Sequence, residues 1–136
     1  MIEFHLDSRS GVAPYLQLIH QVRHALRLDL LRQGEQLPTV KDVAAGLAIN
    51  PNTVLKAYRE LEYQGLVAAR PGRGTFVTGT LGGASMAAQE PLRRELRRWL
   101  GKARRSGMDE ESIEALLLST FRSTTSEDPI MNKDTA

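Results

Sequence analysis

The sequence contains no cysteine, few aromatic residues and no long hydrophobic run. Without cysteine, the chain can form neither a disulfide framework nor a thiolate metal site or redox switch. Its apolar runs fall short of the ~18 residues that a membrane span requires, and its N-terminal segment lacks the basic and apolar parts of a signal peptide. We therefore expect a cytoplasmic protein that has no membrane partner.

The composition suits one small folded domain with an appendage. Of the 136 residues, 41% are hydrophobic, which is enough for a modest core. The formal net charge of +2 permits binding to nucleic acid, but the placement of charges on the surface matters more than their sum. The charge alone therefore assigns no partner.

Two elements are expected ahead of residue 34. Ile2, Phe4 and Leu6 alternate with polar residues, which indicates a short strand or an extended arm. From Pro14 to about Arg32, apolar residues recur at helical spacing and predict one long supporting helix. The stripe consists of Tyr15, Leu18, Ile19, Val22, Ala25, Leu26 and Leu30.

A short helix, a turn and a second helix are predicted between residues 39 and 64. Thr39 and Asp42 form a capping box at the first helix start, because a hydroxyl and a carboxylate can each accept a hydrogen bond from a free amide. Asn50 is a good N-cap for the second helix, and Pro51 suits its first position. Helical spacing places Val54, Ala57, Tyr58 and Leu61 on one face and Asn52, Leu55, Lys56 and Arg59 on the other.

A β-hairpin is predicted directly after the second helix, which Gly65 ends. Two short β-like runs, residues 67–70 and 75–78, flank the sequence Pro71-Gly72-Arg73-Gly74. This turn leaves the Arg73 side chain near the hairpin tip, beside glycines that let the backbone approach another surface closely. The order helix, turn, helix and hairpin is typical of a winged helix-turn-helix, whose second helix enters the DNA major groove.

The same segment resembles the GntR family of bacterial transcription regulators. The motifs that carry the resemblance are Pro14-Tyr15, Gln36-Leu37-Pro38-Thr39, Asn50-Pro51-Asn52-Thr53-Val54, Ala57-Tyr58-Arg59-Glu60-Leu61-Glu62, Gly65-Leu66-Val67 and Arg70-Pro71-Gly72-Arg73-Gly74-Thr75-Phe76-Val77. The short remainder resembles the YtrA-like subfamily, which implies a small helical dimerisation tail and repression of a transporter operon. Leu55 and Ala48 depart from the pattern, since relatives more often have a polar residue and a glycine there.

The helix-turn-helix geometry and the resemblance together define candidate DNA contacts. Asn52 can read adenine bidentately, and Leu55 can contact a thymine methyl group. Arg73 is assigned to the minor groove, and the resemblance implies an operator contact for Lys41. The full set is Lys41, Asn50, Asn52, Thr53, Leu55, Lys56, Arg59, Arg70, Gly72, Arg73 and Gly74.

Each candidate also has a purely structural alternative. Lys41 can be a solvated surface lysine, Asn52 or Thr53 can cap the helix, and Leu55 can be an exposed leucine without a role. Arg59 can pair with Glu60 or Glu62. The hairpin tip can be an ordinary turn.

The C-terminal part is predicted to be a linker followed by two amphipathic helices. Pro91 can start the first helix, which Gly107 ends, and Asp109 is a candidate N-cap for the second. Because two such short helices cannot bury both of their apolar stripes alone, we expect them to pack against a second copy of the chain. The dimerisation residues are then Leu92, Leu96, Trp99, Leu100, Ile113, Leu116, Leu117 and Phe121.

Two further polar groups are interpreted as surface features that bind no ligand. A cluster of basic residues between Arg93 and Arg105 is interpreted as a solvated helix face, which Glu95 and the carboxylates at residues 109–114 neutralise. His20 and His24 are four residues apart and can direct two imidazoles at one metal ion. Since a third ligand is missing, we interpret them as surface or interface histidines.

The sequence therefore predicts a mainly α-helical protein with a small β-hairpin. Residues 1–79 are the winged helix-turn-helix domain, 80–90 a linker, 91–123 a helical dimerisation region and 124–136 a disordered tail. The predicted function is a homodimeric repressor that binds a palindromic operator in double-stranded DNA. The alternative is an architectural or accessory DNA-binding protein without a specific operator.

No enzymatic activity and no cofactor are expected. The sequence has no phosphate-binding glycine motif, no paired carboxylates in an apolar setting and no Ser/His/Asp order. A small-molecule effector, if the protein has one, would have to bind at the dimer interface or between the domains.

Overall fold

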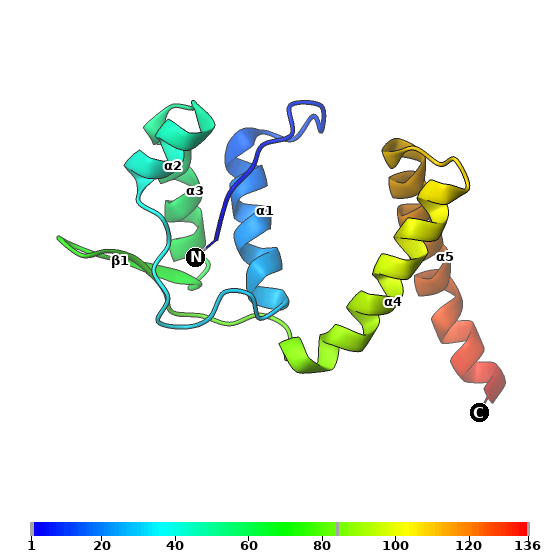
Figure 1. Ribbon diagram of the computed structural model, residues 1–136. Helices are drawn as coiled ribbons and strands as arrows, with labels where there is room; N and C mark the ends of the chain where they lie inside the picture. Colours follow the sequence, from blue (N-terminus) through cyan, green and yellow to red (C-terminus); the bar gives the residue numbers. More distant parts are fainter. Residues whose placement is uncertain (1, 84, 136) are drawn as a thin grey trace. The chain divides into compact units, whose positions relative to one another are not determined.

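The computed structural model describes residues 2–83 and 85–135, with side chains up to residue 124. The chain forms two compact units, Met1–Gln89 and Glu90–Ala136, which are described separately. A mainly helical chain with one two-stranded sheet confirms the predicted fold class (Figure 1). The elements are α1 (Pro14–Arg27), α2 (Val40–Leu47), α3 (Pro51–Tyr63), β1 (Val67–Arg70), β2 (Gly74–Val77), α4 (Met86–Arg105) and α5 (Glu110–Thr135).

The first unit has one core, built from the apolar stripes of its three helices and from the hairpin. Leu18 and Val22 of α1 and Val54 and Leu61 of α3 are completely buried, as the helical spacing predicts. Each such side chain stabilises the fold by roughly 1.5–3 kcal/mol relative to its exposed state. Tyr58 is also buried, and its hydroxyl donates a 2.6 Å hydrogen bond to the Pro38 carbonyl oxygen. Burial raises the pKa of this phenol.

Helix α1 is shorter than the sequence predicts, because it ends at Arg27 and not near Arg32. Asp29 adopts a left-handed conformation, with φ of 58°, and turns the chain directly after the helix. As a result Leu30 is exposed, whereas Leu31 is buried in the core. The helical period stops applying at the turn, so the prediction that Leu30 belongs to the buried stripe is wrong.

The N-terminal residues form an extended arm along α1 (Figure 1). The side-chain amides of Gln17 and Gln21 replace a neighbouring strand: Gln21 exchanges hydrogen bonds of 3.1 and 2.7 Å with the His5 backbone, and Gln17 exchanges bonds of 2.8 and 3.0 Å with Asp7. Gln17 and Gln21 are four residues apart on the helix, which is about 6 Å, and Asp7 and His5 are two residues apart on the extended arm, which is about 6.6 Å. Because these distances are similar, both glutamines can bond the arm at the same time. The arm thus gains no strand partner from the sheet.

The helix-turn-helix is built from local caps, although the described hydrogen bonds include only the Thr39 half of the predicted capping box. The Thr39 hydroxyl accepts a 3.1 Å hydrogen bond from the Asp42 amide, and the Asn50 side chain accepts a 2.8 Å bond from the Asn52 amide. Ala48 ends α2 in a left-handed conformation, with φ of 55°. This conformation costs an alanine about 1–2 kcal/mol, whereas glycine adopts it freely.

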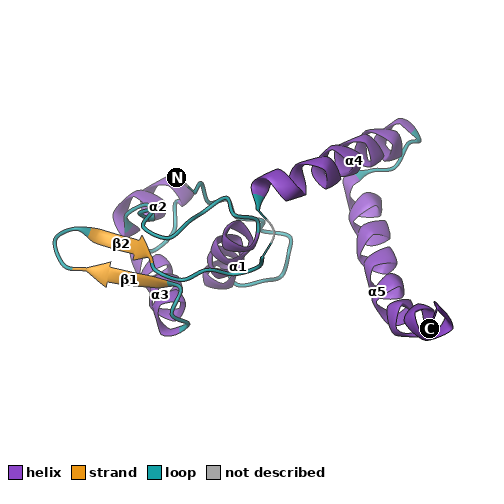
Figure 2. Ribbon diagram, turned by 90° about the horizontal axis from the view of Figure 1, so that it is seen from below, coloured by secondary structure: helices purple, strands orange, loops and turns teal. Residues whose placement is uncertain are grey.

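Strands β1 and β2 pair antiparallel, with Val67 opposite Val77 and Arg70 opposite Gly74 (Figure 2). The Arg73 amide donates a 2.9 Å hydrogen bond to the Arg70 carbonyl, and Gly72 has φ of 75°. With proline ahead of Gly72, this is a type II turn.

The segment before α2 runs along β2 and ties the hairpin to the unit. The Val77 amide donates to the Glu35 carbonyl over 2.8 Å, and the Leu37 amide donates to the Thr75 carbonyl over 2.8 Å. The sequence did not indicate this third extended segment.

The second unit contains most of α4 and all of α5. Helix α4 begins at Met86, inside the predicted linker, because the Ser85 side chain caps it through a 3.1 Å bond from the Ala88 amide. Pro91 therefore lies inside the helix and does not start it. Gly107, with φ of 94°, ends α4 as predicted.

Asp109 caps α5, as predicted, by accepting a 2.8 Å hydrogen bond from the Ser112 amide. Hydrogen bonds from the Ser112 side chain and backbone lower the pKa of this exposed carboxyl. Helix α5 continues across residues 124–135, for which the sequence predicts disorder. The side chains from residue 125 onward lie outside the described residues, and the predicted tail stays a prediction.

Ile113 and Ala103 are buried within the second unit, whereas most of its other apolar side chains are exposed. The prediction that Ile113 contributes to an open dimerisation face therefore needs correction, since this side chain is covered within its own chain. In the described part of the protein, no helix combines the length and hydropathy that a bilayer span needs.

Candidate nucleic-acid interface

The solvent-facing side of α3 carries five of the eleven predicted DNA contacts. Asn52, Lys56 and Arg59 are exposed, while Thr53 and Leu55 are half-buried. The opposite side of α3 is buried in the core, so the 3.6-residue period divides the helix as the sequence predicts. The packing of the buried side of α3 thus fixes the position of its polar side.

A groove of about 800 Å³ runs between this side of α3 and α1. Leu55 lines the groove, which accounts for its partial burial. The other lining residues are Tyr15, Leu16, Ile19, His20, Arg23, Asn52, Lys56, Arg59, Glu60, Tyr63 and Gln64. Three cationic side chains, Arg23, Lys56 and Arg59, therefore line a groove that also contains apolar side chains.

Lys56 is held by an aromatic side chain that was not among the predicted site residues. Its ammonium nitrogen lies 3.8 Å from the centroid of the Tyr15 ring, which is a cation–π contact. Tyr15 stands at the second position of α1, forty-one residues before Lys56. Only the packing of α1 on α3 brings these residues together.

The two carboxylates that could pair with Arg59 have other partners. Glu60 accepts a 3.1 Å hydrogen bond from Gln64, and Glu62 accepts a 2.9 Å bond from the Ala69 amide. In the described part of the chain, Arg59 takes part in no ion pair. Its guanidinium is therefore available to an external anion.

The N-cap of α3 decides between the alternatives for Asn52 and Thr53. Asn50 caps α3, so neither Asn52 nor Thr53 has that role. The side-chain oxygen of Asn50 already accepts the hydrogen bond from the Asn52 amide. Only the side-chain NH₂ group of Asn50 could therefore donate a hydrogen bond to a ligand. Lys41 is exposed in the first turn of α2, two residues after the capping residue Thr39.

The hairpin tip exposes Arg73 and holds its backbone from behind. The side-chain amide of Gln36 donates a 3.0 Å hydrogen bond to the Arg73 carbonyl oxygen. Gly74 has φ of 124°, and a β-carbon there would collide with the Gln36 side chain. Arg70 extends over the Phe76 ring, with its guanidinium carbon 5.3 Å from the ring centroid. The supporting role of Gln36 was not predicted, although the residue stands in one of the motifs that carry the resemblance.

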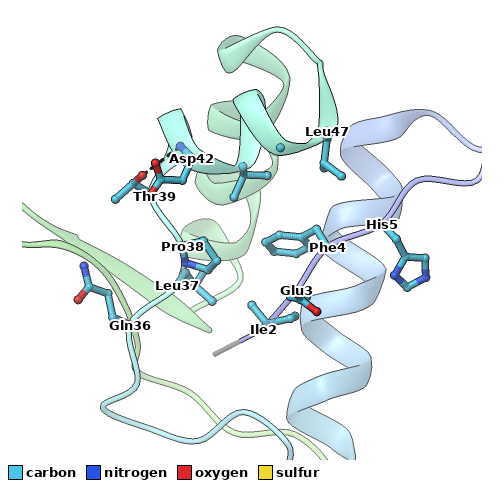
Figure 3. Close-up of a pocket in the computed structure, with 12 residues that line it drawn as sticks. Ile2, Glu3, Phe4, His5, Gln36, Leu37, Pro38, Thr39, Asp42 and Leu47 are labelled. Atoms are coloured by element: carbon cyan, nitrogen blue, oxygen red, sulfur yellow. Dashed lines mark hydrogen bonds between the residues drawn. The ribbon is translucent and has the colours of Figure 1, made fainter.

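A second groove of about 720 Å³ lies between the N-terminal arm and α2 (Figure 3). Figure 3 shows the Phe4 ring between Pro38 and Leu47, on the side of the arm that faces α2. Two carboxylates, from Glu3 and Asp42, border this groove. Because carboxylates repel phosphate, this groove is not counted as part of the candidate interface.

The His20 and His24 rings stack with centroids 6.5 Å apart. Across the described residues there is no group of three side chains suited to hold a metal ion. Two imidazoles alone do not make a site.

The sequence pattern described as "Bacterial regulatory proteins, gntR family" matches residues 14–77, which run from α1 to β2. The "HTH-type transcriptional repressor YtrA" of Bacillus subtilis is 38% identical over 73 residues, 54% of this chain and 56% of the relative. The "HTH-type transcriptional regulator Rv1152" of Mycobacterium tuberculosis is 41% identical over 73 residues, 54% of this chain and 60% of the relative. The chain thus spans little more than half the length of these curated relatives.

Two solved structures are similar over a larger share of the chain. The structure titled "Transcriptional Antiterminator" from Listeria monocytogenes has a TM-score of 0.56 and 26% identity, covering 88% of this chain and 90% of that one. "YtrA from Sulfolobus acidocaldarius, a GntR-family transcription factor" has a TM-score of 0.52 and 26% identity, covering 71% and 96% respectively.

Proposed function

The chain belongs to the GntR family of bacterial regulatory proteins, and we propose that it is a transcription regulator that binds operator DNA as a homodimeric repressor. The observation that carries the proposal is the exposed, rigidly capped polar side of α3, which stands beside an arginine-tipped hairpin. A recognition helix needs polar side chains that are exposed and not already bonded within the protein. Asn52 and Arg59 meet that requirement.

Helix α3 is proposed to enter the major groove, with its N-terminal residues at the base edges. Asn52 supplies an amide that pairs with adenine, and Leu55 an apolar contact for a thymine methyl. Lys56, Arg59 and Lys41 lie around these two and supply phosphate contacts that set the register. Thr53 and the amide of Asn50 add neutral contacts at the helix start.

The hairpin is proposed to follow the DNA backbone and to place Arg73 in the minor groove. Gln36 supports this role, because it fixes the tip while leaving the guanidinium exposed. Gly72 and Gly74 permit the turn and the close fit against Gln36. Arg70 is pre-positioned over Phe76 for a phosphate contact.

The exposed apolar side chains of the second unit support dimerisation. Leu92 is 66% exposed and Phe121 is 72% exposed, and such large apolar surfaces favour association with a partner. A two-fold dimer presents two recognition helices and therefore selects a palindromic operator. The remaining members of the proposed face are Leu96, Trp99, Leu100, Leu116 and Leu117.

Selection of binding sites from random duplex DNA, followed by affinity measurements at physiological salt, tests the proposal. A repressor should prefer its selected palindrome over random DNA by ~10³ or more. An architectural protein would bind both duplexes alike, with the same strong dependence on salt. Failure to enrich any sequence would contradict the proposed function.

A further inference from the structure

Helix α4 carries a basic face that the proposed function does not use. Between residues 93 and 105 there are seven basic side chains and a single acidic one, Glu95. At about 100° per residue, these basic side chains occupy roughly half of the helix circumference, opposite the apolar stripe of Leu92 and Trp99. The basic residues are Arg93, Arg94, Arg97, Arg98, Lys102, Arg104 and Arg105.

A glycine stands in the middle of this basic face. Gly101 follows Leu92 by nine residues, or about two and a half turns, so that it faces directly away from the apolar stripe. Its surface neighbours on the helix, three and four residues away on either side, are all arginines. We call the glycine and these neighbours, Arg97, Arg98, Arg104 and Arg105, the arginine notch.

Packing among the described residues does not explain Gly101. A β-carbon at this position would meet only the Arg105 guanidinium, with a nitrogen 3.2 Å away, and no atom of another element within 4 Å. A glycine inside a helix is less favourable than an alanine. Here the missing side chain opens a shallow depression into which the Arg105 guanidinium folds.

The part of the chain whose side chains are described neutralises the charge of the notch only weakly. Among the described side chains, α4 has one ion pair, from Arg97 to Glu90, at the outer limit of 4.0 Å. The carboxylates at residues 109–114, which the sequence predicts as neutralising partners, form no ion pair with α4 in the described structure. The helix dipole favours cations only in the last turn, which accounts for Arg104 and Arg105 but not for Arg97 and Arg98.

We propose that the arginine notch binds the phosphodiester backbone of double-stranded DNA, outside the base pairs that the first unit contacts. The proposal rests on the proposed function, since the ligand is the same DNA molecule. A guanidinium group can donate two parallel hydrogen bonds to a phosphate, and six of the seven basic residues on this face are arginine. Gly101 leaves room for the Arg105 guanidinium against the helix, where it can bind a phosphate together with the neighbouring arginines.

A membrane surface fits the notch less well. A basic amphipathic helix can lie on anionic lipid, with its apolar face inserted among the acyl chains. Inserting the stripe of Leu92 and Trp99 would turn Gly101 toward water, because the two lie on opposite sides of the helix. The centre of the basic face would then touch no lipid.

The first test compares two duplexes of random sequence, one just long enough for the first unit and one about ten base pairs longer on each side. The full-length wild type should bind the longer duplex more tightly and with a steeper salt dependence. The double variant Arg98→Gln/Arg105→Gln should abolish that difference. Its salt slope on the longer duplex should fall by about 0.9 for each phosphate that the protein no longer neutralises.

The matched control is Arg9→Gln/Arg27→Gln, which removes the same charge from exposed positions outside both proposed DNA surfaces. It should leave the difference between the two duplexes intact. Because the duplexes have random sequence, the test gives an answer even if no specific operator exists. A wild type that binds both lengths with equal slopes would overturn the notch and leave the proposed function untouched.

The second test fills the notch without weakening the helix. Gly101→Gln and Gly101→Glu both have higher helix propensity than glycine, so both proteins should fold. The glutamate variant should reduce the long-duplex preference more completely than the isosteric glutamine variant, since it also neutralises the arginines. Unchanged slopes for both variants would contradict a phosphate site.

Two further readouts identify other occupants. Light scattering of the double variant as a function of concentration reports whether these arginines instead bind the acidic residues of a second copy. Flotation with vesicles that contain phosphatidylserine reports a lipid surface. A change in either measurement, with unaltered binding to the longer duplex, would overturn the proposal.

Discussion

The Lys56 ammonium lies 3.8 Å above the Tyr15 ring, so helix α1 supplies the aromatic partner for a cation on the proposed recognition helix. The contact limits the freedom of a long side chain before DNA arrives. A side chain that is ordered in advance loses less entropy on binding. Tyr15 is therefore a positioning residue of the interface.

Tyr15→Leu should reduce affinity for the selected DNA by about 0.5–1 kcal/mol, or about two- to fivefold, because leucine cannot form the cation–π interaction. Tyr15→Phe keeps the ring and should bind like the wild type. Binding isotherms for the three proteins decide the matter, with thermal unfolding as a control for stability. Equal reductions in both variants would point to the hydroxyl and not to the ring.

Asn52→Ala should cost roughly 1–3 kcal/mol on the selected operator and relax the preference at one symmetric pair of positions. Binding to scrambled DNA should change little, because base edges contribute nothing there. Affinities on both duplexes measure the effect. If operator and scrambled DNA weaken alike, Asn52 does not read a base.

Lys41→Ala should weaken binding to every sequence, because its proposed partner is a phosphate. The slope of log affinity against log salt should fall by about 0.9 for the one phosphate that lysine would neutralise. Titrations at several salt concentrations supply the slope. An effect confined to the operator would assign Lys41 to a base instead.

Removal of the residues after Gln89 should leave a folded winged domain that is monomeric and binds operator DNA weakly. The first unit keeps its own core, whereas the truncation removes the exposed apolar side chains of the second unit. Light scattering gives the mass, and Leu92→Glu/Leu96→Glu in the full chain is the matched control. A truncated protein that remains dimeric would rule out the proposed dimerisation face.

Ala48→Gly should stabilise the protein by about 0.5–1 kcal/mol. It relieves a left-handed alanine, worth about 1–2 kcal/mol, and part of this gain is offset by the entropy of glycine. Ala45→Gly, an exposed position inside α2, should instead destabilise by about 1 kcal/mol. Denaturant unfolding of both variants compares them directly.

The helix-turn-helix, the hairpin and the caps could be predicted from the sequence because their causes are local. The Thr39 and Asn50 side chains bond amides two or three residues away, and Pro71 and Gly72 set a turn through their own backbone preferences. The buried stripe of α3 follows from its spacing for the same reason. These features needed no knowledge of the remaining chain.

The supports of the interface lie beyond such local reasoning. Gln36 bonds Arg73 across 37 residues, Gln21 bonds His5 across 16, and Tyr15 meets Lys56 only through helix packing. The end of α1 at Arg27 likewise depends on where the chain must turn to bury Leu31. Sequence by itself determined which side chains are candidates for DNA contact. The tertiary structure decided which of them the fold leaves free and how they are held, because contacts between distant residues exist only once the core has packed.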